Sequence, residues 1–168
     1  ARAEAGVSSN GALTEDEAHF LAERDSFYMA SVSETGWPYV QHRGGPKGFL
    51  RVLSASAIGF ADYSGNRQYI STGNLLENPR VALILVDYPN QARLKILGEA
   101  RVVDAATHPE LMAQLTIENS NARVERGTII RPKGFDWNCP QFITPRWTAE
   151  ALQRVLPRTT GPSRRGFC

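Results

Sequence analysis

The stretch VALILVDYPNQARLKILGEARVV, residues 81–103, decides the class of fold. Its first six residues are all apolar, which predicts a central β-strand that is buried on both faces. Residues 87–90 have the composition of a turn. Residues 92–103 alternate well enough between apolar and polar side chains to predict a second, longer strand. A β-rich protein is therefore expected.

Shorter strands are predicted on the N-terminal side of this stretch. Strand-like runs occur at residues 27–32, 37–42, 49–53, 57–61 and 66–71, and residues rich in Gly and Pro separate several of them. A Thr-x-x-Glu capping box at Thr14 predicts the start of a helix. A second helical turn is predicted at residues 72–78, because Pro79 would end it.

On the C-terminal side, a helix is predicted at residues 104–119, a last strand at 124–135 and a short helix at 148–156. Strands at short intervals with helices at the ends favour a barrel with peripheral helices over a doubly wound sheet. No repeat or linker indicates a second domain. We expect a flexible N-terminal arm at residues 1–12, one domain at 13–156 and a basic, disordered tail at 157–168.

Composition excludes several classes of protein. The 168 residues are 42% hydrophobic and 21% charged, as in an ordinary globular domain. The net charge is only +2 and the basic residues are spread along the chain, which argues against a nucleic-acid-binding protein. The longest apolar run is far shorter than the roughly 20 residues of a membrane-spanning helix. Two cysteines support neither a disulfide scaffold nor a zinc site, so a reducing cytoplasm is the expected setting.

Familiar catalytic motifs are missing from the sequence. It contains neither of the glycine-rich nucleotide motifs, no His-Glu-x-x-His and no Gly-x-Ser-x-Gly. His19, His42 and His108 are far apart along the chain, so we expect no metal site. Cys139 has no base beside it, and a packed cysteine is the commoner interpretation.

A first candidate site lies at residues 42–51, where four cationic or potentially cationic side chains accompany three glycines. The four are His42, Arg43, Lys47 and Arg51. Glycine lets a ligand approach the backbone closely, and on a strand Lys47, Phe49 and Arg51 would share one face. These features predict a phosphate site. The alternative is a solvated loop and edge strand, where Lys and Arg prevent pairing with other chains.

A second polar cluster covers residues 62–69 and includes Asn66, Arg67 and Gln68. Ser71 and Asn74 follow it where a helix N-terminus is expected, and free N–H groups there attract phosphate. The alternative is an ordinary N-cap and turn.

A third cluster, residues 135–142, combines the flat Trp137 with amide groups, among them Gln141, that can hydrogen-bond the edge of a heterocycle. The alternative for these residues is packing in the core.

Several of these segments, in this order, resemble the pyridoxamine 5'-phosphate oxidase-related, FMN-binding split-barrel family. The segments are residues 43–50, 60–69, 73–75 with 77–79, 93–96 and 137–141, and the resemblance extends over residues 13–146. It implies a mainly β (α+β) fold, a six-stranded split β-barrel with peripheral helices, and a homodimer with FMN in a groove between the subunits. It places Arg51, Arg67, Ser71 and Asn74 near the phosphate.

The resemblance also places Trp137 and Gln141 close to the ring system of FMN. Together with the clusters above, it gives ten candidate cofactor-binding residues. They are Arg43, Lys47, Arg51, Asn66, Arg67, Gln68, Ser71, Asn74, Trp137 and Gln141.

The expected function is that of a cytoplasmic, FMN-dependent oxidoreductase that acts on a small substrate or accepts electrons from a nicotinamide donor. FMN would do the redox chemistry while the protein binds and orients it. No residue stands out as an acid or base, so no catalytic residue is assigned. Two alternatives remain: a non-catalytic flavin-binding or carrier protein, and a deazaflavin- or haem-binding member of the superfamily, in which His42 or His108 would ligate the haem.

Overall fold

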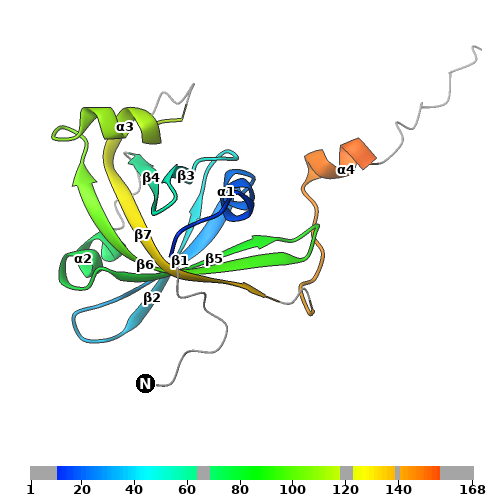
Figure 1. Cartoon of the computed structure of the whole chain (residues 1–168), viewed down its shortest axis with the longest axis horizontal. Helices are drawn as coiled ribbons and strands as arrows, with labels where there is room; N and C mark the ends of the chain where they lie inside the picture. Colours follow the sequence, from blue (N-terminus) through cyan, green and yellow to red (C-terminus); the bar gives the residue numbers. More distant parts are fainter. Residues whose placement is uncertain (1–10, 64–68, 118–122, 139–140, 156–168) are drawn as a thin grey trace, which may run out of the picture.

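A computed structural model gives the structure of the protein and describes residues 11–63, 69–117, 123–138 and 141–155. The elements are α1 (Glu15–Ala22), β1 (Ser26–Val32), β2 (Pro38–Gly44), β3 (Arg51–Ser54), β4 (Ala57–Tyr63), α2 (Ile70–Glu77), β5 (Arg80–Asp87), β6 (Ala92–Asp104), α3 (Pro109–Leu115), β7 (Val124–Asn138) and α4 (Ala149–Val155). Strands dominate and the helices lie around them (Figure 1). The predicted mainly β class is confirmed.

Within the described residues, seven strands form one antiparallel sheet in the order β2-β1-β5-β6-β7-β4-β3. Side chains from its two ends meet across the interior. Phe27 on β1 packs edge-to-face on Phe60 of β4 at 5.5 Å, and Arg43 on β2 forms an ion pair with Asp62 of β4 at 3.6 Å. The sheet is therefore curled around its core, as in the predicted split barrel, with seven strands where six were implied.

The main hydrophobic core lies on the inner face of the curled sheet. On β5, Val81, Leu83 and Leu85 are buried there, while Ala82 and Ile84 on the outer face are only half-buried. The prediction that this strand is buried on both faces is therefore confirmed for the inner face only.

A second, smaller core lies under α3, at one end of the sheet (Figure 1). Met112 and Leu115 of α3 pack there with Val103 and Ile129. A Cβ on Gly127 would lie 2.6 Å from Met112 Cε and 2.7 Å from Leu115 Cδ1, so a larger residue there would force the ends of these two flexible side chains to move.

Local elements differ from the prediction where strand pairing competes with a local pattern. The helix predicted at 104–119 covers only Pro109–Leu115, because β6 pairs with β7 as far as Asp104 and Arg126. The strand predicted at 66–71 is wrong at its described end, since Ser71 lies in α2. None of the described helices is long and apolar enough to cross a membrane.

The segment between β2 and β3 also differs from the prediction. Residues 45–50 form a loop, so Lys47, Phe49 and Arg51 do not share a strand face. Phe49 enters the core instead and stacks on Phe27 at 5.6 Å. Burial of this aromatic ring outweighs continuation of an edge strand.

Candidate functional site

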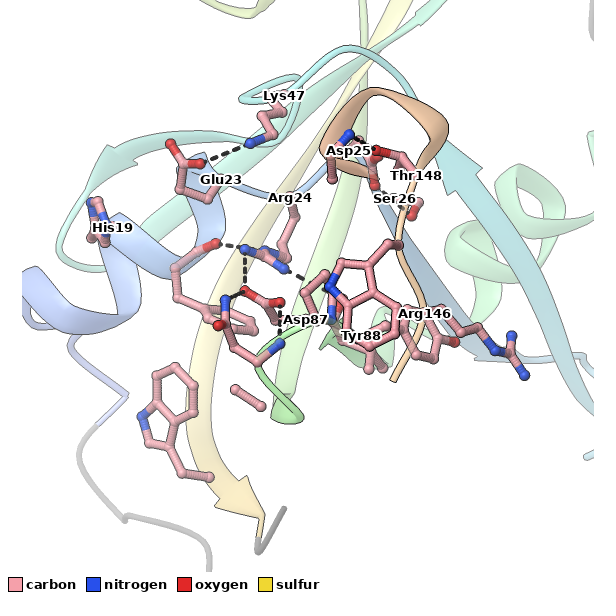
Figure 2. A pocket seen from close by; sticks show the side chains of 18 of the residues that line it. His19, Glu23, Arg24, Asp25, Ser26, Lys47, Asp87, Tyr88, Arg146 and Thr148 are labelled. Carbon is pink, nitrogen blue, oxygen red and sulfur yellow. Dashed lines mark hydrogen bonds and ion pairs between the residues drawn. The ribbon is translucent and has the colours of Figure 1, made fainter. Parts of the chain in front are cut away.

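A groove of about 900 Å³ opens between α1, the turn from β5 to β6 and the segment that precedes α4 (Figure 2). Four aromatic side chains line it: Phe20, Tyr88, Trp137 and Trp147. The two indoles are 41% and 52% exposed, respectively, although large apolar groups are normally covered. The groove therefore offers flat apolar walls to a planar ligand.

The floor of the groove is fixed by a buried ion pair. Figure 2 shows Arg24 directed at Asp87, with Nη2 and Oδ2 2.8 Å apart. Asp87 also accepts hydrogen bonds from the backbone N–H and the side-chain amide of Asn90, both at 3.1 Å. Burial alone would raise the pKa of Asp87, but the bonds from Asn90 and the Arg24 charge outweigh it and lower that pKa. The floor is thus charged and rigid at neutral pH.

One wall of the groove is built from α1 and the end of β7. The indole Nε1 of Trp137 donates a hydrogen bond to Oε1 of Glu17 at 2.6 Å, and Phe20 packs edge-to-face on the indole at 4.8 Å. At the rim, Lys47 forms an exposed ion pair with Glu23 at 3.0 Å (Figure 2). Two of the predicted site residues, Lys47 and Trp137, therefore line the same groove.

Arg51 lies beside the loop that carries Lys47. Gly48 in this loop has a φ of +76°, and a Cβ on it would lie 3.9 Å from Nη1 of Arg51 and 3.4 Å from the carbonyl oxygen of Ala22. Nε of Arg51 is buried and has no hydrogen-bond partner among the described residues. A guanidinium whose buried Nε has no partner among the described residues is a suitable hydrogen-bond donor to a phosphate group.

Arg43 lies apart from the groove, in a recess of about 200 Å³ that His42, Phe60 and Asp62 also line. Its guanidinium faces the ring of Phe60 at 5.4 Å and pairs with Asp62, which Arg126 approaches to 4.0 Å. Burial lowers the pKa of Arg43, and Asp62 opposes that shift. Arg43 therefore forms an ion pair that joins β2 to β4 across the curled sheet.

Ser71 and Asn74 are buried and hydrogen-bonded inside the protein. The Ser71 hydroxyl donates to Oε1 of Gln41 at 2.8 Å, and the Asn74 amide donates to Oγ of Ser31 at 2.9 Å. These bonds attach α2 to β1 and β2, which is a structural role. Gln141 is exposed and is not among the residues that line the groove.

Three of the ten candidates, Asn66, Arg67 and Gln68, lie outside the described residues, as do most of the predicted arm at 1–12 and the tail from 157 onward. The described parts of the chain hold no group of three or more His, Cys, Asp or Glu side chains that could bind a metal.

The two histidines considered as haem ligands both lie at the surface. His108 shares a hydrogen bond with the Thr107 hydroxyl at 2.8 Å, and His42 packs edge-to-face on Tyr28 at 5.3 Å.

Sequence reasoning missed four residues that the structure singles out. Arg24 and Asp87 form the floor of the groove, Glu17 holds Trp137, and Nε of Arg93 is buried without a partner among the described residues. The capping box identified Glu17 only as part of a helix start. No local pattern connects Arg24 with Asp87.

Comparison with known proteins places the chain in a family. The sequence profile of the pyridoxamine 5'-phosphate oxidase family matches residues 13–135, and the chain belongs to this family. A search of curated proteins finds no match.

Similar solved structures share the fold at low sequence identity. A candidate pyridoxamine 5'-phosphate oxidase from Lactobacillus delbrueckii is 21% identical, with 77% of this chain and 98% of that chain covered and a TM-score of 0.58. An FMN-binding protein from Syntrophomonas wolfei is 12% identical, with coverages of 74% and 85% and a TM-score of 0.54. HupZ from Group A Streptococcus is 13% identical, with coverages of 80% and 100% and a TM-score of 0.54.

Proposed function

We propose that the protein is an FMN-dependent oxidoreductase. The observation that carries this proposal is that Lys47 and Trp137, which the sequence assigns to the two ends of FMN, line one groove. Arg51, whose buried Nε has no partner among the described residues, lies beside the loop that carries Lys47. The exposed indole suits a flat ring, and Lys47 and Arg51 supply cations for a phosphate; Lys47 would have to leave its exposed ion pair with Glu23 to bind it. When bound, FMN would supply the hydride and electron chemistry.

In this proposal the chain's own residues bind and orient the cofactor. Arg51, with Lys47, holds the phosphate, and the Trp137 indole contacts the ring. Gln141, which does not line the groove, is assigned to the ring edge only by the sequence resemblance, as a source of an amide. Of the remaining candidates, Arg43, Ser71 and Asn74 have partners inside the protein away from this groove. Asn66, Arg67 and Gln68 lie outside the described residues.

The size of the groove favours an enzyme over a carrier. Its volume of about 900 Å³ is near the upper end of the range, roughly 300–1,000 Å³, seen for small-molecule sites. That leaves room for a flavin ring and a second small molecule, which a carrier does not need. The second molecule would be a small organic substrate or a nicotinamide donor.

We also propose that the protein works as a homodimer through the outer face of its sheet. The strand register aligns Val40, Ala30, Ala82 and Leu97 in one row across β2, β1, β5 and β6. Val40 is 59% exposed and Leu97 38%, and Tyr28 lies beside this row at 42%. An apolar sheet face of this kind typically marks an interface, and a second copy would cover it by two-fold symmetry.

The test is reconstitution of the purified protein with FMN and, separately, with riboflavin, followed by a visible spectrum. Oxidised flavin, deazaflavin and haem have distinct bands, so the spectrum also tests the alternative cofactors. Arg51→Ala should weaken FMN binding about tenfold or more, since a charge-assisted phosphate bond contributes roughly 1.5–3 kcal/mol, and riboflavin binding much less. The matched control is Arg101→Ala, which changes an exposed arginine on β6.

Two results would contradict the proposal. Equal losses for FMN and riboflavin in Arg51→Ala would show that Arg51 does not bind the phosphate. A bound flavin that neither NADH nor NADPH reduces, and that no small oxidisable substrate reduces, would identify a carrier instead of an enzyme.

A further inference from the structure

The carboxylate of Glu17 connects two distant parts of the chain. It is only 4% exposed, and its two oxygens serve different partners. Oε2 accepts hydrogen bonds from the backbone N–H and the hydroxyl of Thr14, which closes the start of α1. Oε1 accepts the indole N–H of Trp137, 120 positions further along the chain, at 2.6 Å.

The bond to Trp137 is not needed for the helix start. A capping box uses only the contacts between Thr14 and Glu17, so the second oxygen does something that helix capping does not explain. A buried carboxylate with three donors remains ionised at neutral pH, and a hydrogen bond to an ionised acceptor is about twice as strong as a neutral one. Glu17 therefore holds the indole more firmly than a neutral acceptor would.

Two contacts hold the indole ring of Trp137 in one orientation. Its N–H edge is fixed by Glu17, and Phe20 approaches at an interplanar angle of 78°. Trp137 as a whole is 41% exposed, and it lines the groove. The aromatic surface that a ligand would meet is therefore fixed before any ligand arrives, which reduces the entropy lost on binding.

A negative charge behind an indole also changes how the indole interacts with a redox-active ring. The charge makes the indole more electron-rich, so it stacks better on an electron-poor ring than on an electron-rich one. It also disfavours extra negative charge nearby, and the low dielectric of a buried site strengthens that effect. Both effects favour the oxidised form of a flavin over the two-electron reduced form.

We propose that Glu17 is a positioning residue for the flavin site: it fixes the Trp137 indole against the ring and lowers the reduction potential of the bound flavin. This inference rests on the proposed function, in which Trp137 contacts the ring. It assigns to Glu17 a role in the redox site in addition to its role at the start of α1.

The decisive variant is Glu17→Gln: its single amide oxygen keeps the bond from the Thr14 N–H, as Gln does in a capping box, while its NH2 group leaves the indole N–H of Trp137 without an acceptor. We expect the ratio of the affinities for oxidised and reduced FMN to fall about fivefold, because the variant removes the negative charge that disfavours the reduced flavin. For a two-electron couple, in which a tenfold change is 29.6 mV, this raises the reduction potential by about 20 mV. Thr14→Ala is the matched control: it weakens the helix cap but leaves the charge behind Trp137, so it should lower the melting temperature without moving the potential.

A second readout needs no cofactor. In a background in which Trp37 and Trp147 are replaced by Phe, emission reports Trp137 alone. Glu17→Gln should then make the indole more accessible to acrylamide in the flavin-free protein, and Thr14→Ala should not. Equal accessibility in all three proteins would refute the positioning role.

The outcomes separate this inference from the function on which it rests. If FMN does not bind, or if Trp137→Leu leaves both FMN affinity and flavin emission unchanged, the proposed ring site is wrong and the inference fails with it. If Trp137→Leu weakens FMN binding while Glu17→Gln leaves the potential unchanged, the ring site stands and the role of Glu17 is refuted.

Discussion

Replacing Asp87 by Ala should lower the free energy of unfolding far more than the loss of a surface ion pair would. The Arg24 and Asp87 side chains are only 14% and 11% exposed, so the variant leaves a largely buried guanidinium with only the carbonyl oxygens of Phe20 and Val86 as partners. Breaking a buried pair in this way costs about 3–5 kcal/mol, against a total stability of about 5–15 kcal/mol for a typical domain. With a urea m-value of about 2 kcal/mol/M, the unfolding midpoint should fall by about 1.5–2.5 M.

The chain provides a matched control in the neighbouring pair of Glu23 and Lys47, whose side chains are 47% and 65% exposed. Glu23→Ala should cost less than about 1 kcal/mol, because water screens an exposed pair. The double variant Arg24→Met with Asp87→Ala should recover part of the loss, since it removes the unpaired charge. Equal midpoints for Asp87→Ala and Glu23→Ala, or a double variant no more stable than Asp87→Ala, would refute the argument that burial makes this pair strong.

Three further predictions concern pH, the loop before β3 and the outer face of the sheet. Burial alone would raise the pKa of Glu17, but its hydrogen bonds outweigh burial and hold the pKa below its ordinary 4.5. Ionised Glu17 therefore stabilises the fold above about pH 4.5, and this stabilisation is lost as pH falls through the lower pKa of the folded state. Urea midpoints measured from pH 3 to 7 should vary less with pH in Glu17→Gln than in the unmodified protein. Gly48→Ala should cost about 1–2 kcal/mol in thermal unfolding, because φ is +76°, whereas Gly73→Ala on α2, where a Cβ meets open space, should be neutral or stabilising. Leu97→Lys should give a monomer in light scattering, while Leu76→Lys, on α2 and 78% exposed, should not; a dimer that survives Leu97→Lys contradicts the proposed interface.

Local patterns in the sequence predicted most of the individual elements. The capping box at Thr14 located the start of α1, and the apolar run at 81–86 identified β5. Both signals act over a few residues, since capping and burial periodicity are properties of a single element. The mainly β class followed from the spacing of such elements.

The contacts that build the groove were beyond this kind of reasoning. Glu17 and Trp137, like Arg24 and Asp87, meet only because the sheet brings α1 against the end of β7 and the turn after β5. Periodicity says which face of an element is buried but not what it is buried against. Phe49 shows the same limit: its neighbours look like a strand, yet the core takes up its ring and the segment becomes a loop.

The strand order also constrains how the chain can fold as it is synthesised. β4 has β3 on one side, but its other neighbour is β7, so Phe60 and Ile58 keep an open flank until residue 130, which pairs with Ile58, has been made. At about 5–20 residues per second, the 67 residues from 64 to 130 take about 3–13 s to add. Throughout that interval the hairpin of β3 and β4 presents an unpaired strand edge beside apolar side chains, the state most prone to pair with other chains. A nascent chain of this protein should therefore recruit chaperones before the β7 partner of β4 has been synthesised. A nascent chain on a ribosome stalled before residue 124 should be prone to aggregate.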